Sequence, residues 1–314
     1  MISRRDYLKL SAMAGVALAA SSKGLLAAEG ERALITRSIP GTSEQLPVVG
    51  LGSSASFQRI AGQGDTAAIQ ALLDALARNP KSVFDTAPSY GSSEEVAAGV
   101  ARTSGLNQKL FWATKVNVAG WGGSKADPAA ARAQMDRSIQ WLGKSPIDLI
   151  QVHNLADLPT QLGLLKEYRD AGRVRFIGVT TTIPDQYESL EKLMRDEALN
   201  FIGVDYAIDH RTMEERIFPL AQERNIGVLV YQPFGRSRLW EKVKGQTVPE
   251  WAGEYDIASW GQFFLKFVVS HPAVTTATPA TSNVRNLVDN LGAATGRLPD
   301  DEGRRRMFAH IEAL

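Results

Sequence analysis

The sequence has no cysteine. This absence excludes disulfide bonds, thiolate metal sites and a cysteine nucleophile, and we expect no metal. Charge of either sign is also not in excess, because 35 Lys and Arg residues against 34 Asp and Glu residues leave a formal net charge of +1. Proteins that bind nucleic acid or acidic membranes concentrate positive charge, so neither partner is expected. The 314 residues are 44% hydrophobic, with no Pro- or Gly-rich linker and no short repeat, which indicates a sizeable core.

The N-terminus has the three zones of an export signal. A charged start carries Arg4 and Arg5, an apolar stretch follows over Ser11–Ala20, and small residues recur at Ala27 and Ala28. The apolar zone is shorter than the roughly 20 residues that span a bilayer. The paired arginines resemble a twin-arginine signal, the alternatives being an amphipathic leader or a chance pair.

We therefore interpret residues 1–28 as a twin-arginine-type signal segment and residues 29–314 as a single barrel domain. The expected location is the periplasm, or another exported location reached through the twin-arginine machinery. If the segment is not cleaved, it becomes a membrane anchor.

Short apolar runs alternate with amphipathic stretches along the rest of the chain. First, residues 33–49 hold a Pro40-Gly41 turn between two apolar runs, which predicts a β-hairpin. Eight later runs are typical of buried strands: Val48–Gly52, Ser82–Asp85, Leu110–Lys115, Ile147–His153, Phe176–Thr180, Phe201–Tyr206, Gly227–Tyr231 and Thr275–Thr278. The helical patterns between and after them are Asp65–Arg78, Ser93–Ala101, Asp127–Leu142, Pro159–Ala171, Pro184–Arg195, Glu214–Arg224, Ile257–Ser270 and Val284–Ala294.

Eight such units predict an α/β fold, the (β/α)8 TIM barrel, with an N-terminal β-hairpin. An open doubly wound sheet is the alternative. No G-x-G-x-x-G fingerprint follows the first strand, which weakens that alternative.

Polar residues end several of the predicted strands, where a barrel places its chemistry. Asp85, Lys115 and His153 end the second, third and fourth strands, and Tyr90 follows in the loop after Asp85. Reduction of a carbonyl by hydride needs a proton donor for the developing oxyanion. Tyr90 is the candidate donor, because a neighbouring ammonium such as Lys115 favours the phenolate. Asp85 would hold Lys115, and His153 would orient the carbonyl oxygen.

These residues stand in strings that resemble the signature of the aldo-keto reductases. The strings are Phe84-Asp85-Thr86-Ala87-Pro88-Ser89-Tyr90-Gly91, Thr114-Lys115 and Val152-His153-Asn154, followed by similar segments as far as residue 294. The resemblance implies that Asp85, Tyr90, Lys115 and His153 form a catalytic tetrad. It also implies NADPH as the cofactor, bound by Gly52, Ser53, Asp85, Asn154, Thr180, Thr181, Tyr231, Gln232, Pro233, Gly235, Arg236, Thr281, Asn283, Arg285 and Asn290.

The chain departs from the family pattern at several cofactor positions. Thr181 stands where many members carry Asn, Gly203 where they carry Gln, and Ala280 where they carry a cation. Arg285 is one place away from the usual arginine. Because a 2′-phosphate is held best by a cation, NADH stays open as the alternative cofactor.

The expected substrate is a small carbonyl compound, an aldehyde or a ketone. Its contacts would be Phe57, Tyr90, Trp121, His153 and Trp240, the aromatic residues among them forming the pocket walls. Two other functions stay open at this point. One is a Schiff-base lyase that uses Lys115, and the other is a non-catalytic barrel that binds a nicotinamide cofactor.

Overall fold

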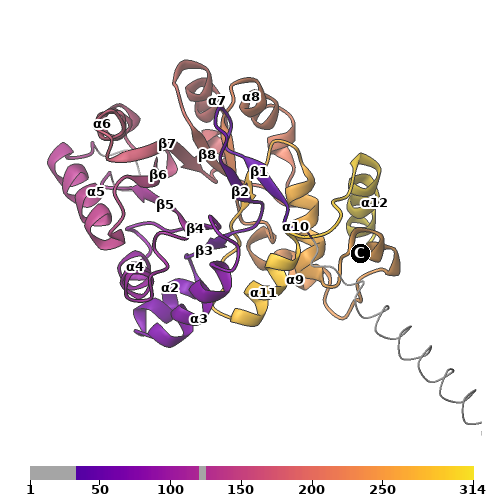
Figure 1. The fold of residues 1–314 in the computed structure, drawn as a ribbon. Helices are drawn as coiled ribbons and strands as arrows, with labels where there is room; N and C mark the ends of the chain where they lie inside the picture. The colour runs from indigo at the N-terminus through magenta and orange to yellow at the C-terminus, as the bar shows by residue number, and fades with distance from the viewer. Residues whose placement is uncertain (1–32, 120–124) are drawn as a thin grey trace, which may run out of the picture. The chain divides into compact units, whose positions relative to one another are not determined.

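The computed structural model describes residues 33–119 and 125–314, so the predicted signal segment and Trp121 lie outside the described residues. Residues 34–314 form one compact unit (Figure 1). Its main sheet has eight parallel strands in the order β10-β9-β8-β7-β6-β5-β4-β3. The strands are β3 (Leu51–Gly52), β4 (Val83–Asp85), β5 (Phe111–Val116), β6 (Ile147–Val152), β7 (Val174–Thr181), β8 (Phe201–Asp205), β9 (Gly227–Tyr231) and β10 (Thr276–Ala277).

The first and the last strand of this sheet meet. Parallel bridges join Val49 to Ala277 and Gly52 to Ala280, and they complete the ring. The predicted TIM barrel is therefore confirmed, and the open doubly wound sheet is wrong. The predicted hairpin is also confirmed, as β1 (Thr36–Ser38) pairs antiparallel with β2 (Gln45–Pro47).

Helices follow the strands at the predicted places. The α-helices are α2 (Ser56–Gly62), α3 (Thr66–Leu76), α4 (Ser93–Thr103), α5 (Pro128–Leu142), α6 (Leu158–Asp170), α7 (Tyr187–Asp196), α8 (Ile217–Glu223), α9 (Arg238–Lys242), α10 (Trp260–Ser270), α11 (Val284–Gly292) and α12 (Asp301–Glu312). Short 3-10 turns are η1 (His153–Leu155), η2 (Pro184–Gln186), η3 (Thr212–Glu214), η4 (Gly235–Ser237) and η5 (Glu250–Tyr255). Among the described residues, no helix has the length and apolar character needed to cross a membrane.

Local sequence explains where several helices begin. The side chain of Asp65 accepts a hydrogen bond from the backbone N–H of Ala68, and Asp127 accepts one from Ala129, so each carboxylate caps its helix. Three helices were not predicted. Of these, α2 and α9 are too short for a periodic pattern. The third, α12, is strongly polar, and it is attached through Arg304, which donates to the hydroxyl of Tyr206 at 2.7 Å.

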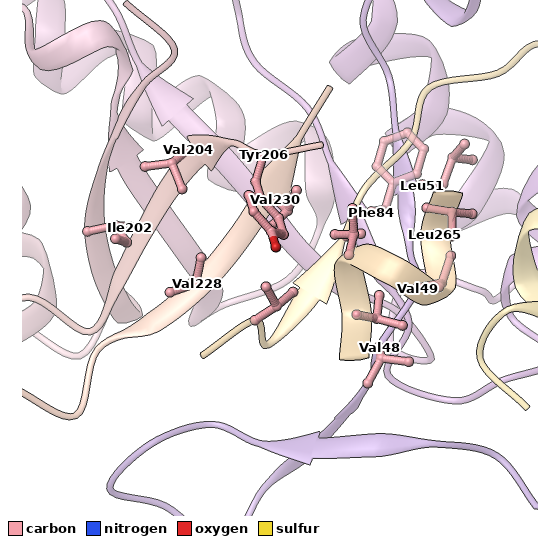
Figure 2. Packing of buried hydrophobic residues seen from close by; sticks show 14 of the residues in the cluster. Val48, Val49, Leu51, Phe84, Ile202, Val204, Tyr206, Val228, Val230 and Leu265 are labelled. Carbon is pink, nitrogen blue, oxygen red and sulfur yellow. The ribbon is translucent and has the colours of Figure 1, made fainter. Parts of the chain in front are cut away.

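Two hydrophobic layers hold the barrel together. Strand side chains alternate between the outside and the lumen, and the outward set packs against the helices. Leu51, Val230 and Leu265 belong to this outer layer, which joins β3, β9 and α10 (Figure 2).

The lumen layer lies at the starts of the strands. Phe111, Phe176 and Phe201 meet there with Ile39 and Leu46 of the hairpin. The hairpin thus closes the N-terminal end of the barrel, and the C-terminal end stays open for a site.

Candidate active site

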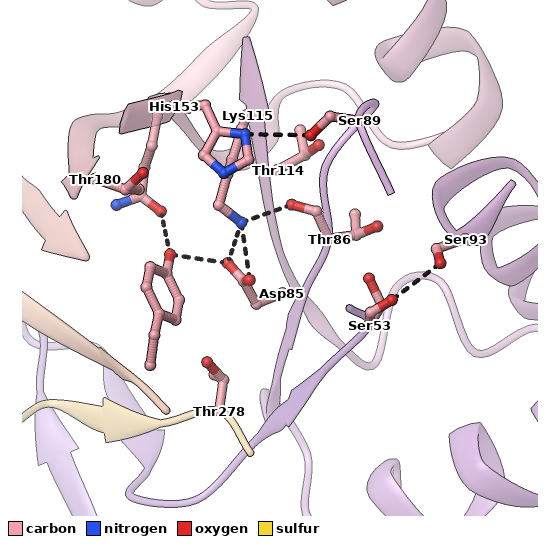
Figure 3. A network of polar contacts seen from close by, with 12 residues as sticks. Ser53, Asp85, Thr86, Ser89, Ser93, Thr114, Lys115, His153, Thr180 and Thr278 are labelled. Atoms are coloured by element: carbon pink, nitrogen blue, oxygen red, sulfur yellow. Dashed lines mark hydrogen bonds and ion pairs between the residues drawn. The ribbon is translucent and has the colours of Figure 1, made fainter. Parts of the chain in front are cut away.

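Asp85 and Lys115 form a buried ion pair at the C-terminal ends of β4 and β5 (Figure 3). The Nζ atom of Lys115 lies 3.0 Å from Oδ1 and 2.8 Å from Oδ2 of Asp85, and it also donates to the carbonyl of Thr86 at 2.8 Å. Burial by itself lowers the pKa of Lys115, but Asp85 and Tyr90 together raise it above its ordinary value. Burial raises the pKa of Asp85, and Lys115 opposes that effect. The ammonium is therefore held charged and immobile.

Tyr90 lies beside this pair, in the loop after β4. The Nζ atom of Lys115 is 5.2 Å from the centre of the Tyr90 ring. We expected the ammonium to lower the pKa of Tyr90. Burial is the largest effect and raises the pKa of Tyr90. The charge of Lys115 offsets part of that rise, whereas the charge of Asp85 adds to it. Tyr90 therefore keeps its proton at neutral pH, as a proton donor must.

His153 stands edge-on to Tyr90, with 5.8 Å between the ring centres. Burial and the charge of Lys115 lower the pKa of His153 to about 3, so the imidazole is neutral. Its Nδ1 atom lies 3.3 Å from the hydroxyl of Ser89 and 3.5 Å from the amide nitrogen of Asn117. An amide nitrogen can only donate, so Nδ1 accepts and the ring proton sits on Nε2. His153 is thus prepared to donate a hydrogen bond through Nε2.

Ser89 and Asn117 were not among the predicted site residues. The sequence carried one signal for each of them. Ser89 directly precedes Tyr90, and Asn117 lies two residues after Lys115, on the same face of the extended chain.

A cavity of about 510 Å³ opens over these residues. The predicted site residues that line it are Gly52, Asp85, Tyr90, His153, Asn154, Thr180, Tyr231, Gln232, Pro233, Arg236 and Trp240. Residues outside the predicted set of site residues also line it: Ser54, Ala55, Thr182, Phe234, Ser237, Thr278, Pro279 and Ala280. The structure thus brings the four tetrad candidates and a large part of the predicted cofactor set to one place.

The loop after β9 has an unusual backbone beside this cavity. Gln232, Gly235, Arg236 and Ser237 have φ values of 55°, 58°, 52° and 79°. Left-handed backbone is costly for residues other than glycine, and it concentrates at ligand sites. The Nε atom of Arg236 donates to the side chain of Gln232 at 2.9 Å, which places a guanidinium at the cavity wall.

Other predicted residues lie outside the cavity lining. Ser53 is buried and its backbone N–H donates to the backbone carbonyl of Asp85, while the hydroxyl of Thr181 donates to the side chain of Gln186. Gly235 belongs to the left-handed loop after β9. The predicted adenosine-side residues lie on or before α11, where Thr281 and Asn290 are buried and Asn283 and Arg285 are exposed.

Phe57 requires a correction. We expected it at the substrate wall, but it is 0% exposed and packs edge-on against Phe84. It is a core residue, because α2 turns its apolar face toward β4. Within the described part of the chain, no group of three or more His, Cys, Asp or Glu residues has the arrangement of a metal site.

Comparisons with known proteins point in one direction. The model of the Aldo/keto reductase family matches residues 48–306. The aldo-keto reductase str7 of Strobilurus tenacellus is 23% identical over 261 residues, covering 74% of this chain and 77% of that protein. The probable aldo-keto reductase 1 of Glycine max is 24% identical over 255 residues, covering 70% and 73%. The solved structure of an aldo/keto reductase from Klebsiella pneumoniae in complex with NADP and acetate has a TM-score of 0.68 at 23% identity, covering 87% of this chain and 94% of that one.

Proposed function

This chain belongs to the aldo/keto reductase family, and from that premise we propose that it reduces an aldehyde or a ketone to an alcohol with NADPH. One observation carries the proposal. Asp85, Tyr90 and His153 line a single cavity at the open end of the barrel, and Lys115 is ion-paired to Asp85 directly beneath it. A proton donor, a hydrogen-bond donor and a fixed positive charge therefore surround one point.

The proposed chemistry divides between these side chains. NADPH, when bound, supplies the hydride to the carbonyl carbon. Tyr90 donates its phenolic proton to the carbonyl oxygen. His153 donates a hydrogen bond from Nε2 to the same oxygen and so fixes its position. Lys115 stabilises the phenolate that Tyr90 leaves behind, and Asp85 keeps Lys115 in place.

The residues present fit a nicotinamide cofactor. The Arg236 guanidinium stands at the cavity wall beside the left-handed turn over residues 235–237 and suits a diphosphate, because a guanidinium forms charge-assisted hydrogen bonds with phosphate oxygens. Asn154 and Thr180 line the cavity wall and are hydrogen-bonded to each other, since the backbone N–H of Asn154 donates to the Thr180 hydroxyl at 3.2 Å. The Klebsiella pneumoniae relative is described with NADP, which favours the phosphorylated form for this chain as well.

The geometry disfavours both alternative functions. A Schiff-base lyase needs a neutral, accessible amine. The Lys115 side chain is 0% exposed, has three hydrogen-bond acceptors and has a raised pKa. A non-catalytic barrel would not require a buried ion pair and a neutral histidine gathered around one phenol.

The direct test uses the purified protein, a panel of small aldehydes and ketones, and the loss of reduced nicotinamide absorbance. We expect Tyr90→Phe to bind NADPH with unchanged affinity, as measured by nicotinamide fluorescence. Its kcat should be about 100- to 10,000-fold lower than that of wild type. Tyr168→Phe is a matched control, because the Tyr168 hydroxyl donates to Asp136 on the outside of the barrel. Full turnover by Tyr90→Phe would remove Tyr90 from the mechanism.

We also propose that residues 1–28 export the protein through the twin-arginine machinery, because Arg4 and Arg5 precede an apolar zone that ends in small residues. Fractionation of cells that express the full chain tests this. Wild type should leave the cytoplasm and an Arg4→Lys/Arg5→Lys double variant should stay there. The N-terminal residue of the exported protein then distinguishes cleavage from a retained anchor, and cytoplasmic wild type would refute export.

A further inference from the structure

Tyr231 reaches from the cavity into the barrel lumen. Its hydroxyl lies 3.1 Å from Oδ1 of Asp85 and 3.1 Å from Oε1 of Gln151. The amide nitrogen of Gln151 faces the carbonyl of Val179 at 3.4 Å, so the amide oxygen is the end that points toward Tyr231. The hydroxyl has one proton, and the charged carboxylate of Asp85 is its stronger acceptor.

The position of the Tyr231 ring depends on Gly203. A Cβ atom built on Gly203 would lie 2.5 Å from Cε2 and 2.6 Å from the hydroxyl oxygen of Tyr231. Such distances are far inside van der Waals contact, so any side chain at residue 203 would displace the ring. Because Gly203 on β8 has no side chain, the Tyr231 ring occupies the space beside it.

The Asp85 carboxylate therefore has two kinds of donor. Lys115 donates to both oxygens, and Tyr231 donates to Oδ1. The Nζ atom of Lys115 lies 5.2 Å from the Tyr231 ring centre and 5.2 Å from the Tyr90 ring centre. The ionisable groups that face Tyr231 are thus Asp85 on β4, Lys115 on β5 and Tyr90 in the loop after β4, while β8 presents Gly203.

We propose that Tyr231 is a positioning residue that acts through Asp85: its hydroxyl shares the charge of the carboxylate, so that Lys115 remains available to the phenol of Tyr90. The proposal rests on the proposed carbonyl reductase function. Burial and the neighbouring Asp85 raise the pKa of Tyr231 well above its usual value, so its hydroxyl remains a donor. Removal of that donor concentrates the Asp85 charge, holds Lys115 more tightly to Asp85 and makes Tyr90 a weaker acid.

The first experiment compares Tyr231→Phe, which keeps the ring and loses the hydroxyl, with wild type. We expect kcat for carbonyl reduction to fall about tenfold, the equivalent of one pKa unit, and the alkaline limb of the pH profile to move to higher pH. The Kd for NADPH should stay within about twofold. Tyr187→Phe is the matched control, because its hydroxyl donates to Asp205 at 2.8 Å outside the cavity, and its kcat and pH profile should equal those of wild type.

A double-mutant cycle tests whether the effect passes through Asp85. In an Asp85→Asn background, Tyr231→Phe should lower kcat by less than about twofold. Full additivity of the two losses would overturn the proposal, and so would an unchanged pH profile for Tyr231→Phe.

A second readout does not depend on turnover. In the protein without cofactor, the urea midpoints of Tyr231→Phe, Asp85→Asn and the double variant should be non-additive, since the two side chains are in contact. If wild type reduces no carbonyl and the midpoints are still non-additive, the proposed function fails and the Tyr231–Asp85 contact stands. If the midpoints are additive, the positioning role is refuted.

Gly203→Ala tests the space beside the Tyr231 ring. It should raise the Kd for NADPH measured by fluorescence, because the added methyl group displaces the Tyr231 ring. An unchanged Kd together with a wild-type kcat would count against the dependence of the Tyr231 ring on Gly203.

Discussion

Replacement of Lys115 by Met should be among the most damaging single changes in this barrel. The change removes three hydrogen bonds, two to Asp85 and one to the carbonyl of Thr86. It also leaves the Asp85 carboxylate, whose side chain is 4% exposed, without its ammonium partner. Breaking a buried pair in this way costs about 3–5 kcal/mol.

Urea unfolding of the protein without cofactor measures that cost. Lys144→Met is the matched control at the other end of the barrel. Its partner Asp148 would keep Arg175 at 2.9 Å and the backbone N–H of Trp112 at 2.9 Å. The control loses two partly buried hydrogen bonds, to Asp148 and to the carbonyl of Leu110, so we expect it to cost about 1–2 kcal/mol.

Two further measurements separate a lost charge pair from lost packing. The double variant Lys115→Met/Asp85→Asn should recover at least half of the lost free energy, because the uncompensated charge is gone. The free-energy cost of Lys115→Met relative to wild type should also be smaller at acidic than at neutral pH. The raised pKa of Asp85 rises further without the ammonium, and a raised folded-state pKa contributes stability that is lost as the pH increases. A cost below about 1 kcal/mol for Lys115→Met, or no recovery in the double variant, would refute the role of this ion pair.

Three other predictions follow from the same geometry. Asn117→Asp should lower kcat about tenfold or more with little change in NADPH affinity, because a carboxylate beside Nδ1 of His153 would move the ring proton from Nε2 to Nδ1. Steady-state kinetics measures this effect, and an unchanged kcat would contradict the Nε2–H tautomer of His153. The folded pKa of His153 is about 3 and its unfolded pKa is about 6.5, so the unfolded chain takes up the proton first as the pH falls between these values. His153 should therefore lower the free energy of unfolding by at most about 1.4 kcal/mol for each pH unit in this window. His153→Gln should flatten the acid side of the stability curve, and an equal slope in the two proteins would disprove the assignment. Arg285→Ala should raise the Kd for NADPH more than that for NADH in a fluorescence titration, because Arg285 is an exposed cation in the first turn of α11, and equal changes would exclude a contact with the 2′-phosphate.

The amino-acid sequence by itself determined the architecture and the tetrad candidates. Alternation of buried strands with capped amphipathic helices is a local property of the chain, and Asp65 and Asp127 cap the helices as their sequence context predicts. Because parallel strands in a barrel end at the same rim, the residues that end successive strands must be neighbours. Asp85 and Lys115 could therefore be paired before any distance was known.

The tertiary structure decided how these groups are held. Phe57 lies in the core because α2, too short to be recognised from its periodicity, turns it inward. The proton of His153 is assigned to Nε2 by Asn117, a residue of another strand end. The hydroxyl of Tyr231 reaches Asp85 because Gly203 on the neighbouring strand has no side chain that would displace the Tyr231 ring. Each of these facts depends on contacts across the barrel between residues distant in sequence, and the depth and crowding of a lumen follow from all eight strands together, which no local pattern encodes.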